Sequence, residues 1–390
     1  MRIVLYKGQS QYGSLRLHVD QLARALAELG HDALVVDLTA PDANDALKAS
    51  FAPRPDAVFA FGGVGAEIQS NGVSLYDVLG CVYATLHVDN PVHHIGRLSA
   101  RVGRHVAFFL DRSHLEFVRA WPGGAGLAAT AFLPPGANEL AEPADLSDAA
   151  FARRDIPLLF TGTYRGAPAT PWRAQPEGAV KTIMEEVARR MAADARLPIL
   201  KALDATLRQV LNAPLTPDLL GKFAPVLHQP QLYAEAFHRN ALIEVLGEAG
   251  TPVCVYGLGW GALTERFASF AWGGEGSFEE TLSLLRRARL VLNVNNGFVD
   301  GGHERVFTAL CGGAAVLSDA NPFYADAFTP AELATYDWKK LDAVPGQIAA
   351  LLADEAALAA RARAGATRAL AEHTWRARAQ TIVETIRAVQ

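Results

Sequence analysis

Residues 293–319, with the sequence NVNNGFVDGGHERVFTALCGGAAVLSD, combine turns and side chains that suit a negatively charged ligand. Glycines in the first part of this segment permit tight turns, and the N–H groups at the start of the following helix attract anions. Arg305 stands in the first helical turn, where a positive side chain opposes the helix dipole. A bound anion would remove this conflict, so the segment predicts a diphosphate site. Alternatively, Glu304 and Arg305 are an ordinary solvated pair at a helix start.

The elements that must position this segment are a strand, a helix and a second strand. Residues 290–293 continue an apolar run typical of a strand, residues 304–310 can form a helix, and residues 314–317 return as a strand. In α/β proteins of this kind, ligands collect where the strands end.

The composition indicates a globular chain with substantial cores. Its 390 residues are 50% hydrophobic and 20% charged, and this length favours two domains or more. The net charge of −5 argues against a nucleic-acid or anionic-lipid partner. Three cysteines are too few for a disulfide framework, and an odd number cannot all pair within one chain. The start lacks the apolar core of a signal peptide and no apolar run is long enough for a transmembrane segment, so we expect a cytoplasmic protein.

Strand and helix patterns alternate along most of the chain, which predicts an α/β protein with two similar halves. A polar, proline-bearing stretch at residues 134–155 indicates the linker between them, and residues 178–249 read as a helical insertion broken by prolines. Ser277 and Glu280 have the spacing of a capping box. Strands are expected at residues 3–6, 33–38, 57–61, 82–86, 106–110, 127–132, 157–160, 253–256, 290–293 and 314–317.

A histidine-rich segment at residues 86–94, LHVDNPVHH, follows one of the expected strands. Four of its side chains could suggest a metal site, namely His87, Asp89, His93 and His94. Adjacent histidines usually point apart, however, and no cysteine or second carboxylate cluster joins them, so we expect no metal here.

A general base is the better functional interpretation of this segment. A carboxylate or imidazole at a strand end could take the proton from an acceptor hydroxyl. Asp89 is the first candidate, followed by His94 and His18. Alternatively, Asp89 only caps the turn before Pro91.

Several stretches in both halves resemble the glycosyltransferases of the GT-B fold, and in particular the bacterial spore-maturation-type (CgeB-like) family. The stretches are HERVFTALCGGAAVLSD at residues 303–319, YGLGW at residues 256–260, FTGTYRG at residues 160–166 and VDNPVHH at residues 88–94. Thr308 stands where the family usually has a glutamate that binds the ribose of the nucleotide. This departure puts ribose recognition in doubt, and Glu304 could substitute only if the turn differs.

The resemblance implies two Rossmann-like domains facing a cleft, with the helical insertion at about residues 178–249. The acceptor domain would span residues 1–140 and the donor domain residues 156–373, while a helix at residues 374–390 would return to the first domain. The implied activity is metal-independent transfer of a sugar from a nucleotide sugar to a glycan or protein acceptor, with no further cofactor. Two alternative functions remain. One is a sugar-nucleotide epimerase of the same fold, with His303 and Glu304 as acid and base, and the other is a non-catalytic scaffold protein.

The same resemblance and the strand-end turns assign the candidate site residues. Arg305 would neutralise the departing diphosphate. Tyr256 and Gly257 would border the nucleobase if the aromatic ring is exposed, and otherwise they are simply core and turn. For Thr163 and its neighbours, a plain tight turn is the alternative. The remaining donor-side candidates are Gly162, Tyr164, Gly257, Asn293, Asn295, Gly302, His303, Glu304 and Thr308. The acceptor-side candidates are Gly13, Ser14, His18 and Asp111.

Overall fold

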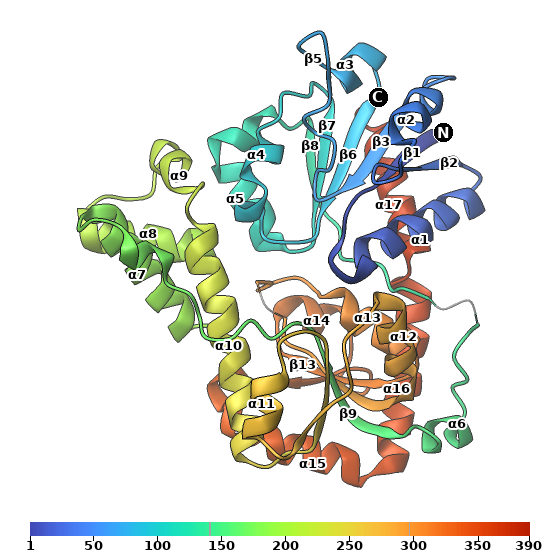
Figure 1. Cartoon of the computed structure of the whole chain (residues 1–390), viewed down its shortest axis with the longest axis vertical. Helices are drawn as coiled ribbons and strands as arrows, with labels where there is room; N and C mark the ends of the chain where they lie inside the picture. Colours follow the sequence, from blue (N-terminus) through green and yellow to red (C-terminus); the bar gives the residue numbers. More distant parts are fainter. Residues whose placement is uncertain (140–141, 296) are drawn as a thin grey trace. The chain divides into compact units, whose positions relative to one another are not determined.

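The computed structural model describes residues 1–139, 142–295 and 297–390. Leu140 and Ala141 of the expected linker, and Asn296 of the expected diphosphate segment, therefore lie outside the described residues. The chain divides into two compact units (Figure 1). Unit 1 comprises Met1–Gly136, Pro214–His228 and Trp375–Gln390, and unit 2 comprises Ala137–Ala213 and Gln229–Thr374.

Unit 1 is built on a six-stranded parallel sheet with the order β2-β1-β3-β6-β7-β8 in the described residues. The central strands β3, β6 and β7 are buried at every residue, as expected for a parallel sheet covered on both faces. The bounds are β1 Arg2–Lys7, β2 Asp32–Asp37, β3 Ala57–Phe61, β6 Val82–His87, β7 His105–Phe109 and β8 Ala129–Phe132, with a small hairpin of β4 Gln69–Ser70 and β5 Val73–Ser74.

Helices flank this sheet, with α1 packed on α17 and α5 packed on β7 and β8 (Figure 1). The helices of unit 1 are η1 Gln11–Gly13, α1 Ser14–Glu28, α2 Ala43–Ser50, α3 Leu75–Leu79, η2 Pro91–His93, α4 Ile95–Leu98, α5 Arg112–Ala120, η3 Pro122–Gly126, α9 Pro217–Phe223 and α17 Trp375–Arg387.

Unit 2 repeats the architecture with a second six-stranded parallel sheet, ordered β11-β10-β9-β12-β13-β14 in the described residues. Its strands are β9 Ile156–Thr161, β10 Val253–Tyr256, β11 Phe270–Trp272, β12 Ala288–Leu292, β13 Ala315–Asp319 and β14 Ala334–Tyr336. Its helices are α6 Asp148–Ala152, η4 Pro171–Ala174, α7 Ala179–Ala193, α8 Ile199–Leu211, α10 His228–Glu248, α11 Gly261–Arg266, α12 Phe278–Arg287, α13 Glu304–Cys311, α14 Pro322–Ala327, η5 Trp338–Ala343, α15 Val344–Ala353 and α16 Glu355–Glu372.

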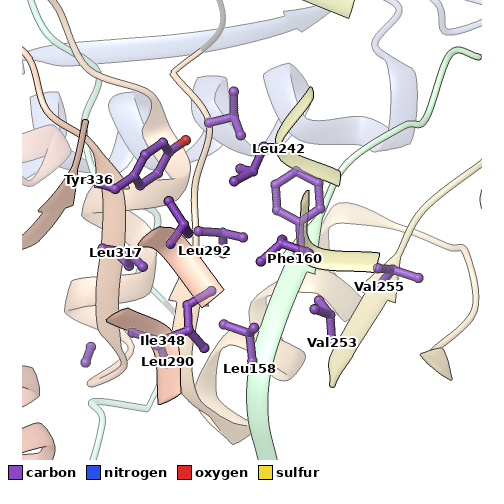
Figure 2. Close-up of a cluster of buried hydrophobic side chains, with 14 of the residues drawn as sticks. Leu158, Phe160, Leu242, Val253, Val255, Leu290, Leu292, Leu317, Tyr336 and Ile348 are labelled. Carbon is purple, nitrogen blue, oxygen red and sulfur yellow. The ribbon is translucent and has the colours of Figure 1, made fainter. Parts of the chain in front are cut away.

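The core of unit 2 holds the strands in register beneath the candidate site. Leu158, Leu290 and Leu317 come from three neighbouring strands, and Leu242 of α10 and Ile348 of α15 pack against the same cluster (Figure 2). All five side chains are at most 1% exposed. The ends of these strands are therefore fixed relative to one another, which positions the turns that follow them.

The predicted fold class of two Rossmann-like α/β domains with a helical insertion is confirmed. The ten expected strands all occur, with ends that differ from the expected ones by at most two residues, and α12 begins with the predicted capping box of Ser277 and Glu280. The expected linker differs from the structure, because residues 148–152 form α6 and its Phe151 is buried in the core of unit 2. Three-residue strands such as β11 and β14 are too short for their pattern to be recognised in the sequence.

Candidate active site

The turns after β9 and β10 lie against each other at the carboxyl edge of the unit 2 sheet. The N–H of Gly162 donates to the carbonyl of Tyr256 at 2.9 Å, and the indole N–H of Trp260 donates to the carbonyl of Gly162 at 2.8 Å. Gly257 has a φ of +129°, and a Cβ there would lie 2.5 Å from the Gly162 oxygen, so only glycine fits. The two predicted turns thus form one continuous backbone surface.

Two arginine side chains converge on this surface from helices far apart in the sequence. A Cβ built on Gly162 would lie 3.4 Å from Nη2 of Arg305 and 4.0 Å from Nη1 of Arg239. Arg239, on α10, also donates to the carbonyl of Thr163, and Arg305, on α13, donates from Nη1 to Oδ1 of Asn293 at 2.8 Å. The predicted residues Gly162, Thr163, Asn293 and Arg305 are therefore brought together.

The electrostatics of this arginine pair favour an anion. Burial, and to a smaller extent the nearby charge of Arg305, lowers the pKa of Arg239 to about 10. Burial also lowers the pKa of Arg305, whose side chain is 9% exposed, while Glu304 opposes that shift. Both groups stay cationic at neutral pH. The carboxylates of Glu235 and Glu304 supply negative charge near them, and a bound diphosphate would be attracted to the same pair of cations.

The loop between β12 and α13 is held by a buried hydrogen-bond network. Asn295 donates its backbone N–H to Asp319 at 2.7 Å and its side-chain Nδ2 to the carbonyl of Gly301 at 2.9 Å. Tyr324 donates its hydroxyl to Oδ1 of Asn295 at 3.1 Å, and Asn321 donates to the same Gly301 carbonyl. The hydrogen bonds of Asn295 thus fix the conformation of the loop, a role that the sequence alone did not indicate.

Asp319 in this network should make the stability of the protein depend on pH. Burial raises the pKa of its carboxyl group to about 6, so between its unfolded value of 3.8 and about 6 the folded state binds more protons. Stability must then fall as pH rises through this range, by about 3 kcal/mol. We expect Asp319→Asn to remove this component of the pH dependence in denaturant unfolding, whereas the exposed Asp337→Asn should keep it. Equal slopes in both variants would contradict the assignment.

His303 caps the start of α13. Its Nδ1 lies 3.2 Å from the backbone N of Arg305 and also against the carboxylate of Glu304. Burial lowers the pKa of His303, although Glu304 opposes the shift. The backbone N–H of His303 donates to Tyr324 at 3.1 Å and that of Val306 to the His303 carbonyl at 3.1 Å. Because these helix-start N–H groups already have protein acceptors, the guanidinium groups are the main donors for an anion.

Thr308 and Gly302 have packing roles in the structure. The Thr308 hydroxyl accepts from the backbone N of Asn138 at 3.1 Å and from its Nδ2 at 3.4 Å, and the residue is 3% exposed. A Cβ on Gly302 would lie 2.9 Å from the ring of Phe307, so this glycine allows the loop to cross the aromatic ring.

Of the two interpretations of Tyr256, an exposed stacking surface or a core residue, the structure contradicts the first and agrees with the second. Tyr256 is 7% exposed and its hydroxyl donates to Glu280 at 3.1 Å. The exposed aromatic side chain at this edge is Trp272, the last residue of β11, which is 51% exposed and donates its indole N–H to the carbonyl of Gly257 at 3.3 Å. Tyr164 lies beside Trp260, with ring centroids 5.7 Å apart.

In unit 1, the structure brings Asp89 and His94 together. The His94 Nε2 lies 3.5 Å from Asp89 Oδ2. Although the surrounding protein partly desolvates the carboxylate, the imidazole of His94 and the charge of His93 lower the pKa of Asp89. The turn before Pro91 is capped by Asn90, whose Oδ1 accepts from Val92 N at 3.2 Å, and this contact leaves Asp89 without the capping role.

The other histidines of this region are buried. Burial lowers the pKa of His87 well below its usual value and that of His93 to about 4, so both imidazoles are neutral at pH 7. Among residues 1–139, 142–295 and 297–390, no three or more His, Cys, Asp or Glu side chains are grouped so that they could hold a metal ion.

The acceptor-side candidates have different local roles in the structure. Gly13 has a φ of +79° at the start of α1, and the Ser14 hydroxyl lies 3.4 Å from that of Ser10. His18 is 3% exposed and packs against the rings of Phe61 and Trp375. Asp111 is fully buried and caps α5 by accepting from Ser113 N at 2.7 Å.

Arg239 is the site residue that sequence reasoning missed. It lies in the middle of a long helical stretch, 76 positions away from the Thr163 carbonyl that it contacts. Its signal in the sequence is its spacing of three and four residues from Leu242 and Ile243, which are buried on the same helix.

Comparison with known proteins agrees with this geometry. Residues 238–384 match a family model described as glycosyl transferase-like, which is less than half of the chain and includes Arg239, Arg305 and β10 to β14. No curated protein sequence matches the chain.

Solved structures match the whole chain. Sucrose-phosphate synthase from Thermosynechococcus elongatus superposes with a TM-score of 0.56 at 13% identity, covering 100% of this chain and 99% of that one. AviGT4, a glycosyltransferase involved in avilamycin A biosynthesis, gives 0.52 at 15% identity with coverages of 100% and 98%. Anabaena Alr3699/HepE in complex with UDP-glucose gives 0.54 at 11% identity, with both chains covered fully.

These likenesses show the GT-B fold, and with the family match they support a glycosyltransferase. They favour neither the epimerase nor the scaffold alternative. In the described part of the chain, no single helix is long and apolar enough to cross a membrane, and one bent pair, Trp338–Ala353 with Glu355–Glu372, meets the criteria of length and composition only when taken together.

Proposed function

We propose that this glycosyltransferase transfers a sugar from a nucleoside-diphosphate sugar bound in unit 2 to a hydroxyl of a glycan or protein acceptor. The observation that carries the proposal is the pair of arginines beside the turn at Gly162, the buried Arg305 and the partly buried Arg239. Glycosyl transfer leaves negative charge on the departing diphosphate, and fixed cationic donors at that position stabilise the transition state. Two guanidinium groups held before the donor arrives are preorganised for this task.

The nucleobase would lie on Trp272. Its indole ring is half exposed and is fixed by the hydrogen bond to Gly257, which suits a stacking surface. In the sheet order β11-β10-β9, the end of β11 lies two strands from the end of β9, about 10 Å away. This spacing is compatible with a nucleoside diphosphate that reaches from Trp272 to the arginine pair. Thr308 has its hydroxyl directed at Asn138, so we assign it no contact with the ribose.

The acceptor hydroxyl would lose its proton to Asp89, and His94 would position the carboxylate of Asp89. Asp89 is the exposed member of this pair, while only 13% of the His94 side chain is exposed. A carboxylate whose pKa is lowered remains ionised at neutral pH and can accept a proton.

Transfer by these groups needs neither a metal ion nor a further cofactor, because arginine side chains supply the positive charge. The motifs at residues 160–166, 256–260 and 303–319 support the narrower assignment to the CgeB-like family. We also propose a cytoplasmic location, where nucleotide sugars are made and where the free thiols of Cys81, Cys254 and Cys311 would stay reduced.

A thermal-shift and hydrolysis screen tests the proposed function. We expect at least one nucleotide among UDP, GDP and dTDP to raise the melting temperature, because a ligand at 100 times its Kd stabilises by about 2.7 kcal/mol. The matching nucleotide sugar should be consumed when an acceptor mixture is added, and at the same rate with EDTA. Loss of turnover in EDTA that added metal restores would refute metal independence, and a screen in which no nucleotide binds would favour the scaffold protein.

A further inference from the structure

A row of three polar side chains runs along one face of α10. Gln231, Glu235 and Arg239 are spaced four residues apart, so they share a helix face. The face can be located through Gly297, which follows β12 in the diphosphate loop. A Cβ on Gly297 would lie 2.6 Å from Oε1 of Glu235 and 3.3 Å from Nε2 of Gln231. The row therefore lies against the same loop and turn that form the proposed diphosphate site.

Gln231 carries a buried acceptor that calls for a partner. The residue is 3% exposed, and its Nε2 donates to Oε1 of Glu235 at 3.1 Å. Only the amide NH₂ can donate to a carboxylate, so the Gln231 Oε1 is the remaining acceptor. No residue in the described part of the chain donates to this oxygen. A buried acceptor without a donor is unfavourable, and an O–H donor from a ligand would satisfy it.

The chemistry of the row changes from one end to the other. Arg239 offers a cation, which suits a phosphate, whereas Glu235 and the Gln231 oxygen are acceptors, which repel a phosphate and suit hydroxyl groups. Each step of four residues advances about 6 Å along the helix axis. In a nucleotide sugar, the sugar directly follows the second phosphate. The order of groups along α10 therefore matches the order of groups in the donor.

We propose that Gln231 and Glu235 bind hydroxyl groups of the transferred sugar and determine which sugar the enzyme accepts. This proposal rests on the proposed diphosphate site at Arg239 and Arg305. It also gives the helical insertion a function, because the first half of α10 closes that insertion and carries the sugar-binding end of the row. The partner chemistry is a sugar that presents two adjacent hydroxyl donors to a carboxylate and an amide oxygen.

Calorimetry on paired ligands tests the proposal. The wild type is titrated with UDP and UDP-glucose, GDP and GDP-mannose, and dTDP and dTDP-glucose, and the pair that binds is then used for the variants. Gln231→Met keeps the side-chain length without the acceptor, and Glu235→Gln removes the charge. Glu244→Gln is the matched control, since Glu244 lies beyond the row, nine residues after Glu235 on α10, in an exposed pair with Arg266.

We expect both row variants to bind the nucleoside diphosphate within twofold of wild type and the nucleotide sugar at least tenfold more weakly. The control should leave both affinities unchanged. Equal weakening of both ligands, or of neither, would overturn the sugar-binding role. A wild type that binds none of the six ligands would instead overturn the diphosphate site on which the proposal rests.

A structural role for the row is separated from a ligand role by stability. Gln231→Met removes an unsatisfied buried acceptor, so we expect its melting temperature to stay within a few degrees of wild type. If either variant fails to fold, Gln231→Asn and Glu235→Asp keep the amide or charge and shorten the side chain. These shorter variants should show the same selective loss of nucleotide-sugar affinity, and wild-type affinity for the nucleotide sugar in both would overturn the proposal.

Discussion

Arg305→Met is expected to lower kcat/KM for glycosyl transfer by about 100-fold or more, because it removes one of two cations that meet the charge of the leaving diphosphate. Removing a donor from a preorganised anion site typically costs this much. Methionine fills much of the arginine volume, so the 9% exposed site should remain packed.

The stability of the free Arg305→Met protein separates a binding role from a structural one. Burial lowers the pKa of Arg239 and the charge of Arg305 lowers it further, so removing Arg305 relieves repulsion in the unliganded state. We therefore expect the melting temperature of the free protein to change little, while the increase caused by nucleotide is lost. Differential scanning fluorimetry with and without nucleotide measures both quantities.

Arg266→Met is the matched control, because Arg266 is an exposed arginine of unit 2 that pairs with Glu244. It should leave turnover and nucleotide stabilisation near wild type, since exposed ion pairs contribute about 0–1 kcal/mol. Turnover close to wild type in Arg305→Met would remove Arg305 from the donor site. A collapse of the free protein's melting temperature would assign it to the fold instead.

The parts of the fold that could be predicted are those whose signal is local. The strand, turn and helix at residues 290–310 are read from apolar periodicity and glycine-rich turns, and the capping box of Ser277 and Glu280 is complete within four residues. The sequence did not indicate α6 because Phe151 is flanked by alanines within a mostly polar stretch, and its burial depends on a core made by distant strands.

The candidate site shows the same limit. Arg305 is recognised because its glycines, strand and helix are adjacent in the sequence, whereas Arg239 reaches the same turn only through the path of α10. Exposure is also a tertiary property. Tyr256 and Trp272 both end strands, but Glu280 and the turns cover Tyr256, whereas Trp272 stays about half exposed. Pattern alone could not distinguish them.

Asp89→Asn should reduce kcat by about 10² to 10⁴, the usual contribution of a general base, without weakening nucleotide binding. Asparagine keeps the shape of the side chain and removes its capacity to take a proton. The matched control is Asp45→Asn, an exposed aspartate on α2 of the same unit, which should have wild-type turnover. Single-turnover measurements with saturating nucleotide sugar isolate the transfer step.

The pH dependence of this step distinguishes the base from its positioning residue. Asp89 works as a carboxylate, so activity is lost as pH falls through its pKa, which His94 and neighbouring charges place below the ordinary value of 3.8. His94→Gln removes the imidazole beside the carboxylate and should let the pKa of Asp89 rise. The acid limb of the rate profile should then move to higher pH, while kcat at neutral pH falls only modestly. A merely structural His94 would lower stability and leave the limb in place. Retention of wild-type turnover in Asp89→Asn would show that the acceptor proton goes to another group, and the transfer would then need a different base from the one that the sequence and unit 1 geometry both indicate.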